Sequence, residues 1–157
     1  MVSIRAAPLT EATDAQLVGV AVVFDQYRRH YGEPVVPGQT LAWLTGNIRQ
    51  RRLTIFTAHL GEDLAGLATI VVLPASLRLS CYWQLRDLYV VPGARRRGAG
   101  RALLNAVREA ATAAGALRVS VQAEPGSTAA LRLYRTSGFT PVEGLQVLML
   151  PFQHGGA

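Results

Sequence analysis

The stretch that decides the fold is "LYVVPGARRRGAGRALLNAV", residues 88–107. An apolar, strand-like run ends at a Pro-Gly pair, three consecutive arginines follow, and two closely spaced glycines lead into a helical pattern. Glycine lets a ligand approach the main chain because it has no Cβ. Free amide groups and the dipole at the start of a helix favour negative charge, and arginine grips phosphate bidentately. The junction therefore predicts a site for a polyanion, most simply a pyrophosphate.

Two familiar phosphate loops do not fit this stretch. Gly93 and Gly98 have the G-x-x-x-x-G spacing of a nucleotide P-loop, but an Ala-Gly pair stands where Lys and Ser or Thr are required. The dinucleotide fingerprint also fails, because Leu103 occupies the position of its third glycine. What remains is Arg95-x-x-Gly98-x-Gly100 between a strand and a helix. The alternative to a phosphate site is a solvated basic turn.

Composition narrows the class of protein. The chain has 157 residues, enough for one domain with a full core, and half of its residues are apolar. The formal charge is +6, and every basic residue is an arginine. Such a charge suggests nucleic acid, but the arginines are spread from Arg5 to Arg135 with one cluster, at 95–97. A single short cluster suits a small phosphorylated ligand better than a long phosphate track, so we expect no nucleic-acid partner.

Other chemistry is scarce in the sequence. Cys81 is alone, so no internal disulfide can form, and the three histidines are scattered without metal-ligand spacing. We expect no metal. No apolar run approaches the ~20 residues that a membrane span requires, and the start of the chain does not resemble a signal peptide. The expected location is cytoplasmic, without a membrane partner.

Periodicity and turn signals predict a single domain over residues 1–151 and a short tail over 152–157. Thr10 is expected to cap the first helix, and Gly115 to end the third. Antiparallel neighbours come first and crossover helices later, which indicates an α/β (α+β) fold with a mixed, mostly antiparallel sheet. The predicted order is a strand at 2–6, helices at 10–31 and 40–51, strands at 53–60, 64–74 and 80–91, a helix at 101–114, a strand at 117–123, a helix at 128–136 and a strand at 145–151.

The stretch at 88–107 resembles motif A of the GNAT superfamily, the acetyl-CoA-dependent N-acetyltransferases. The usual form is a strand ending L-x-V-x-P, then R/Q-x-x-G-x-G/A, then a helix. This chain matches it with Leu88, Val90, Pro92, Arg95, Gly98, Gly100 and the "RALL" helix start.

A second motif follows at the expected distance. "STAALRLYRTSGF", residues 127–139, is similar to the family's N-x-x-A-x-x-x-Y-x-x-x-G-F, with Ala130, Tyr134, Gly138 and Phe139 in register. Ser127 replaces the usual Asn, which normally makes a hydrogen bond near the pantetheine. A serine can still cap the helix. The order of elements agrees with the family over nearly the whole chain.

The resemblance implies a GNAT-like sheet of six to seven strands flanked by four helices and splayed between its central strands. The pantetheine arm of acetyl-CoA would lie in that opening, against the backbone of Leu88, Tyr89 and Val90. The pyrophosphate would bind the amides from Arg96 to Arg101. The expected cofactor-binding residues are Leu88, Tyr89, Val90, Arg95, Arg96, Arg97, Gly98, Ala99, Gly100, Arg101, Ser127 and Tyr134.

In this family an amine attacks the thioester directly, and coenzyme A leaves as a thiolate. Tyr134 matches the general acid that protonates the leaving thiolate. Asp87 is the preferred base, since it lies on the strand beside the cleft; an ion pair with an arginine is its alternative role. Glu124 and a chain of waters are further candidates for the base.

Substrate selection in such enzymes usually falls to the first two helices. "FDQYRRHYGEP", residues 24–34, resembles the tyrosine-rich first helix of the histone- and polyamine-type branch. Tyr27 and Tyr31 are one helical turn apart, so we expect them to bind the aliphatic part of an amine. Asp25 and Glu33 would attract its charge. The alternative is that these aromatics pack the helix against the sheet.

The sequence thus favours an N-acetyltransferase that acts on a primary amine: a small amine, a polyamine, a peptide lysine or an N-terminus. The alternative within the family is a weakly active CoA-binding sensor, which the substitution at Ser127 suggests. The resemblance further implies a homodimer.

Overall fold

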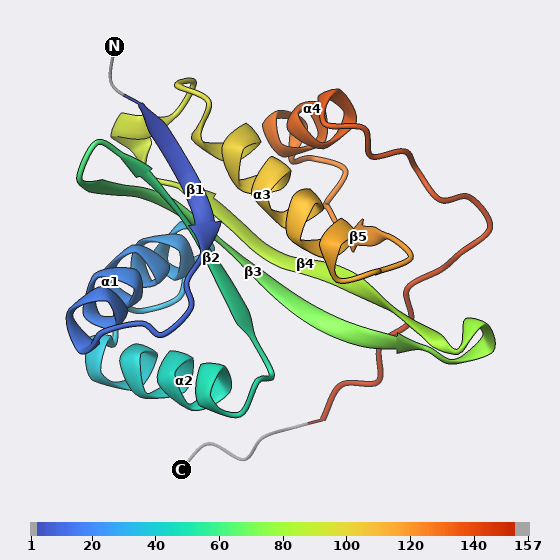
Figure 1. The fold of residues 1–157 in the computed structure, drawn as a ribbon, viewed down its shortest axis with the longest axis horizontal. Helices are drawn as coiled ribbons and strands as arrows, with labels where there is room; N and C mark the ends of the chain where they lie inside the picture. The colour runs from blue at the N-terminus through green and yellow to red at the C-terminus, as the bar shows by residue number, and fades with distance from the viewer. Residues whose placement is uncertain (1–2, 153–157) are drawn as a thin grey trace.

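The computed structural model describes residues 3–152. It contains one mixed sheet of five strands in the order β1-β2-β3-β4-β5 (Figure 1). The first four are antiparallel neighbours, and the last runs parallel to β4. Their bounds are Ile4–Pro8 for β1, Thr54–Leu60 for β2, Asp63–Ala75 for β3, Ser80–Val90 for β4 and Val119–Val121 for β5.

Four helices cover the sheet, two on each face (Figure 1). On one face lie α1 (Asp14–His30) and α2 (Pro37–Arg49), and on the other α3 (Ala99–Ala113) and α4 (Thr128–Thr136). Short 3₁₀ turns at Ser76–Arg78 and Pro92–Ala94 follow β3 and β4. Within residues 3–152, no helix has the length and apolar character that crossing a bilayer demands.

Each face of the sheet has its own core, as the alternation of strand side chains requires. Phe56, Leu85 and Leu103 belong to the cluster under α3 and α4, and all three are almost fully buried. Leu44 and Leu67 belong to the cluster under α1 and α2. The two cores hold the helices on opposite faces of the sheet, and this also positions the loops at the helix ends beside β4.

A β-bulge at Arg86 interrupts β4 near its middle. Thr69 of β3 pairs with Asp87, but the next β3 residue, Ile70, pairs with Leu85, so Arg86 has no partner in β3. Bulges bend the strand and increase its twist. Pairing with β5 ends at the same place, because the last pair is Leu85 with Val121. The sheet therefore opens between β4 and β5 beyond the bulge.

Three local predictions were wrong. The stretch 145–151 is extended but belongs to no strand, so the sheet has five strands rather than six or seven. Its five large apolar side chains are exposed and pair with no strand in the described chain, and β-propensity alone does not make a ladder. The first helix is capped by Thr13 rather than Thr10: the Gln16 N–H donates to Oγ1 of Thr13 at 3.2 Å, and the Thr13 N–H donates to Oε1 of Gln16 at 2.9 Å.

Two further predictions fell close to the observed structure. The strand expected at 117–123 is shorter, Val119–Val121. The first strand begins at Ile4, and the predicted start at Val2 lies outside the described residues, as does most of the predicted tail. Gly115 does follow the end of α3, with a φ of +71°.

Candidate active site

The open half of β4 forms one wall of the candidate site. From Asp87 to Val90 this strand pairs with β3 on one side and has no strand partner on the other within residues 3–152. Leu88 and Val90 pack toward α3, while Tyr89 is buried toward α1. The three residues predicted to bind pantetheine through their backbone thus line the opening.

Arg95 braces the loop that follows β4. Its Nε donates a hydrogen bond to the carbonyl oxygen of Val90 at 3.0 Å. Its guanidinium lies over the ring of Tyr89, 5.6 Å from the centroid. The side chain is thereby partly committed to holding the turn, which separates it from the two arginines that follow.

The turn into α3 presents free amide groups. Arg96 and Gly98 adopt left-handed backbone conformations, with φ of +60° and +93°. Within the described chain, no backbone N–H from Arg96 to Arg101 donates a hydrogen bond; the first to do so is Ala102, to the Gly98 carbonyl at 2.9 Å. Unpaired amides at a helix start form an anion site.

The side chains around these amides are cationic or small. Arg96, Arg97 and Arg101 are exposed, and Arg101 donates to Oγ1 of Thr136 at 3.3 Å. Ala99 is buried against the core. A Cβ on Gly100 would lie 2.9 Å from a methyl group of Leu133, so this glycine lets α3 approach α4. The turn keeps its backbone accessible and its positive charge at the surface.

Tyr134 projects from α4 into the core beside the opening. Its side chain is 8% exposed, and its ring lies 5.6 Å from that of Phe139. Burial raises its pKa to about 12, and electrostatic interactions with Tyr31 and Asp87 contribute to the same shift. The phenol therefore stays protonated at neutral pH.

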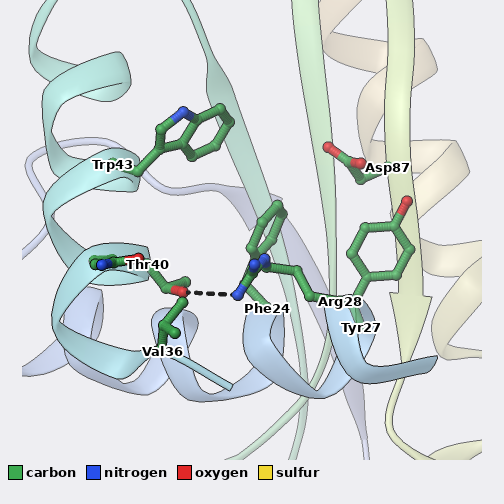
Figure 2. A pocket seen from close by; sticks show the side chains of 8 residues that line it. Phe24, Tyr27, Arg28, Val36, Thr40, Trp43 and Asp87 are labelled. Atoms are coloured by element: carbon green, nitrogen blue, oxygen red, sulfur yellow. Dashed lines mark hydrogen bonds between the residues drawn. The ribbon is translucent and has the colours of Figure 1, made fainter. Parts of the chain in front are cut away.

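Asp87 is held by its neighbour on β3. Thr69, which is fully buried, donates a hydrogen bond from Oγ1 to Oδ2 of the carboxylate. Tyr27 points toward the same carboxylate from α1 (Figure 2). Burial raises the pKa of Tyr27 well above its usual range, with Asp87 as the second cause. The carboxylate therefore has a fixed orientation and faces a phenol that remains neutral.

A pocket of about 440 Å³ lies between α1 and α2 and ends at Asp87 (Figure 2). Aromatic rings form much of its wall: Trp43 stacks on Phe24 at 6.0 Å between centroids, and Tyr27 meets Phe24 edge-on at 5.6 Å. Among residues 3–152, its only charged lining residues are Asp87 and Arg28. The lining residues are Phe24, Tyr27, Arg28, Val36, Gln39, Thr40, Trp43 and Asp87.

Of these lining residues, the sequence predicted only Tyr27 and Asp87 as site residues. Trp43 of α2 is 52% exposed despite its size. Its position off the predicted inward face of Leu41, Leu44 and Ile48 was the sequence signal that could have found it. Arg28 belongs to no sequence motif that would mark it as a site residue. Its role depends on the tertiary fold, since it donates to the Pro34 carbonyl at 2.8 Å and ties α1 to the loop before α2.

Several predicted residues lie elsewhere. Asp25 is 3% exposed and accepts hydrogen bonds from Thr40 at 2.6 Å and Arg28 at 2.9 Å, so it supports the pocket wall rather than facing an amine. Tyr31 ends α1, 59% exposed, with its ring 5.3 Å from that of Tyr27. Glu33 is exposed, with a carboxylate oxygen 4.0 Å from Arg28.

The region before α4 also departs from expectation. Ser127 occupies the N-cap position of α4, but its side chain makes no capping hydrogen bond. Glu124 lies exposed in the turn after β5 and does not line the pocket that contains Asp87. Within residues 3–152 no three side chains of His, Cys, Asp or Glu gather as a metal site requires; the absence of a metal stays a prediction.

Comparisons with known proteins agree with this arrangement. The family model described as "Acetyltransferase (GNAT) family" matches residues 20–139. The uncharacterized N-acetyltransferase YhfO of Bacillus subtilis is 28% identical over 131 residues, which are 83% of this chain and 88% of that protein. A probable acetyltransferase of Haemophilus influenzae is 30% identical over 89 residues, covering 55% of this chain and 60% of the relative.

Solved structures share the fold over almost the full length. The crystal structure of a probable acetyltransferase is 27% identical and superposes with a TM-score of 0.85, covering 97% of this chain and 99% of that one. An aminoglycoside acetyltransferase from a soil metagenomic sample, in complex with sisomicin, superposes with a TM-score of 0.79 at 22% identity, covering 96% of each chain. The family match spans most of the chain, including the opened sheet, the turn of free amides and Tyr134, and the protein therefore belongs to the GNAT family of acetyltransferases.

Proposed function

We propose that this protein transfers an acetyl group from acetyl-CoA to a primary amine that enters between α1 and α2. The observation that carries the proposal is that Asp87 lies on the open half of β4 and Tyr134 packs in the core with Leu88 and Val90 of the same half. One group comes from α4 and the other from β4, and the charge of Asp87 contributes to the raised pKa of Tyr134. A neutral phenol and a carboxylate at one opening are the acid and the base that acyl transfer to an amine needs.

Acetyl-CoA would bind across the turn into α3. Its diphosphate matches the row of unpaired amides from Arg96 to Arg101, and the exposed guanidinium groups of Arg96 and Arg97 are available to its phosphates. Its pantetheine arm matches the unpaired side of β4 at residues 88–90. This assignment makes the arginine cluster a small-ligand site, in line with its short extent.

The chemistry requires two proton transfers. The amine nitrogen loses a proton as it attacks the thioester carbonyl, and the sulfur of coenzyme A gains one as the C–S bond breaks. Asp87, oriented by Thr69, is the proposed acceptor of the first proton. Tyr134 is the proposed donor of the second. We favour Asp87 over Glu124 because Asp87 lines the pocket, whereas Glu124 is exposed in a separate turn.

The pocket favours one class of amine. Three aromatic side chains enclose it, and Asp87 is its only acidic lining residue in the described part of the chain, offset by Arg28. A polyamine or an aminoglycoside carries several positive charges, for which this pocket offers a single counter-charge. The proposed acceptor is therefore a small monoamine with an apolar or aromatic body, rather than a polycation.

The test is release of coenzyme A thiol from acetyl-CoA in the presence of an amine panel. The panel contains aliphatic and aromatic monoamines, spermidine, an aminoglycoside and a lysine peptide. We expect the highest kcat/KM with a monoamine that carries an apolar group. A polyamine or aminoglycoside as the best substrate would overturn the proposed acceptor class. Tight binding of coenzyme A with no turnover on any amine would instead indicate a CoA-binding sensor.

A further inference from the structure

Arg28 lines the pocket between α1 and α2 with only part of its guanidinium group engaged. Three acceptors lie against one nitrogen, Nη1: Oδ1 of Asp25 at 2.9 Å, the carbonyl oxygen of Pro34 at 2.8 Å and Oγ1 of Thr40 at 3.4 Å. Within residues 3–152, neither Nε nor Nη2 donates a hydrogen bond. Nη2 lies 4.0 Å from a carboxylate oxygen of Glu33, which is too long for a hydrogen bond.

The bonds at Nη1 also orient the rest of the group. Asp25 is 3% exposed, and its Oδ1 accepts a second hydrogen bond from Thr40 at 2.6 Å, so the carboxylate that holds Arg28 is itself fixed. A guanidinium group is planar, and Nε and Nη2 form the edge opposite Nη1. Two parallel N–H donors on one edge match the two oxygens of a carboxylate. The side chain of Arg28 is 24% exposed, so a ligand in the pocket can reach this edge.

The start of α2 adds positive potential to the same end of the pocket. Val36 is the N-cap residue and makes no side-chain capping hydrogen bond. Val36, Gln39 and Thr40, all at the start of the helix, line the pocket. The N-terminal end of a helix dipole favours negative charge. The helix end assists a bound anion, while the directed donors come from Arg28.

The pocket therefore carries two unlike charged groups on different elements. Figure 2 shows the guanidinium of Arg28 turned toward Thr40, whereas Asp87 lies on β4 beyond Tyr27. The other rings of the lining are those of Phe24 and Trp43. A plain monoamine would meet Asp87 and leave the Nε–Nη2 edge of Arg28 without an acceptor. A molecule with an amine, an apolar body and a carboxylate would satisfy both ends.

We infer that the acceptor is an amino carboxylate with an aromatic or apolar body, whose carboxylate binds the Nε–Nη2 edge of Arg28 while its amine faces Asp87. The inference rests on the proposed acetyl transfer and narrows the monoamine class named there. Glu33 does not block this edge, because its side chain is 63% exposed and an exposed ion pair contributes little. A substrate carboxylate can take its place beside Nη2.

The test compares aromatic α-, β- and γ-amino acids with their own primary carboxamides as acceptors, measured by thiol release from acetyl-CoA. The members of each pair share their shape and their amine, and only the acid carries a negative charge. We expect at least one acid to exceed its amide in kcat/KM by about tenfold or more, as a charge-assisted bidentate contact implies. The three amine-to-carboxylate spacings show which length fits the pocket.

Two variants assign the preference to Arg28. Arg28→Lys keeps the positive charge but loses the planar edge, so the acid-to-amide ratio of kcat/KM should fall to within about threefold of one. The matched control Arg29→Lys changes the next residue of α1, which is exposed, and should leave the ratio as in wild type. A purely structural role of Arg28 would lower both members of a pair alike and leave the ratio unchanged.

Binding to the wild-type protein is measured separately by calorimetry, with 3-phenylpropanoate and 3-phenylpropanamide, neither of which has an amine to acetylate. We expect the acid to bind more tightly than the amide. Equal binding of the two, or an acid preference in kcat/KM that Arg28→Lys leaves intact, would overturn the inference. If no amine in either series releases thiol, the proposed function fails instead, and tighter binding of the acid would still support the carboxylate site.

Discussion

Removing the hydroxyl of Tyr134 separates its chemical role from its packing role. In Tyr134→Phe the ring stays in place beside Phe139, and only one oxygen atom is lost. Within residues 3–152 that hydroxyl makes no hydrogen bond. Its loss should therefore lower the free energy of unfolding by less than the roughly 0.5–1.5 kcal/mol that one intramolecular hydrogen bond contributes.

The effect on turnover should be much larger. A positioned general acid contributes roughly 10²–10⁴-fold to rate, and each tenfold loss adds about 1.4 kcal/mol to the barrier. We therefore expect kcat to fall roughly 10²–10⁴-fold, which corresponds to an activation barrier about 3–5 kcal/mol higher. Acetyl-CoA affinity should stay near wild type, because the proposed phosphate contacts come from the turn into α3 and not from Tyr134.

Three measurements on one preparation decide this prediction: kcat by thiol release, acetyl-CoA affinity by calorimetry, and Tm by differential scanning calorimetry. Leu133→Met, also on α4 and conservative in volume, serves as the matched control for packing near the site. A kcat within threefold of wild type, or a loss of affinity as large as the loss of kcat, would refute the role of Tyr134 as the acid.

Three further predictions concern the same wall of the site. Gly66→Ala should destabilise the fold by roughly 1–3 kcal/mol in denaturant unfolding, because its Cβ would lie 2.6 Å from a backbone oxygen of β4. Gly46→Ala, which has open space around its Cβ, should be neutral or stabilising. Equal effects of the two substitutions on stability would contradict this prediction. Thr69→Val should lower kcat less than Asp87→Asn, since it frees the carboxylate without removing it, and the reverse order would mean that Asp87 is structural. A proton donor works only while it is protonated, and the pKa of Tyr134 is raised to about 12. We therefore expect no loss of kcat up to pH 10, where an ordinary tyrosine is about half ionised. A fall in kcat with a midpoint near pH 10 would contradict the assignment of Tyr134 as the acid.

The sequence was most informative where a local signal and the final packing agree. The helix predicted at 128–136 has those bounds in the structure, since Ser137-Gly138 ends it. The order of elements was right up to α4. Tyr134 and Asp87 could be chosen because each belongs to a readable pattern, a motif for one and strand alternation for the other. Their catalytic roles remain predictions.

The wrong or missing predictions have a common physical cause: the structure around these residues depends on contacts with residues far away in the sequence. Residues 145–151 have strand composition, but a strand needs a neighbour, and none is present within the described chain. Asp25 looked like an exposed charge on a helix, yet Thr40 and Arg28 draw it into a buried network. Trp43 and Arg28 enter the pocket only because α2 packs beside α1, a contact that no local pattern encodes.

The extra residue at Arg86 changes the alternation of side chains along β4. Before it, odd-numbered side chains such as Trp83 and Leu85 point to the α3 face; after it, even-numbered ones such as Leu88 do so, and Tyr89 points to the α1 face. The insertion therefore inverts parity along β4. Deleting that single residue would join the pairs Thr69–Asp87 and Ile70–Leu85 into one regular ladder, so Asp87 would still face α1. The strand would instead lose the local bend and added twist of the bulge, and with them the departure of β4 from β5 that opens the sheet beside Asp87.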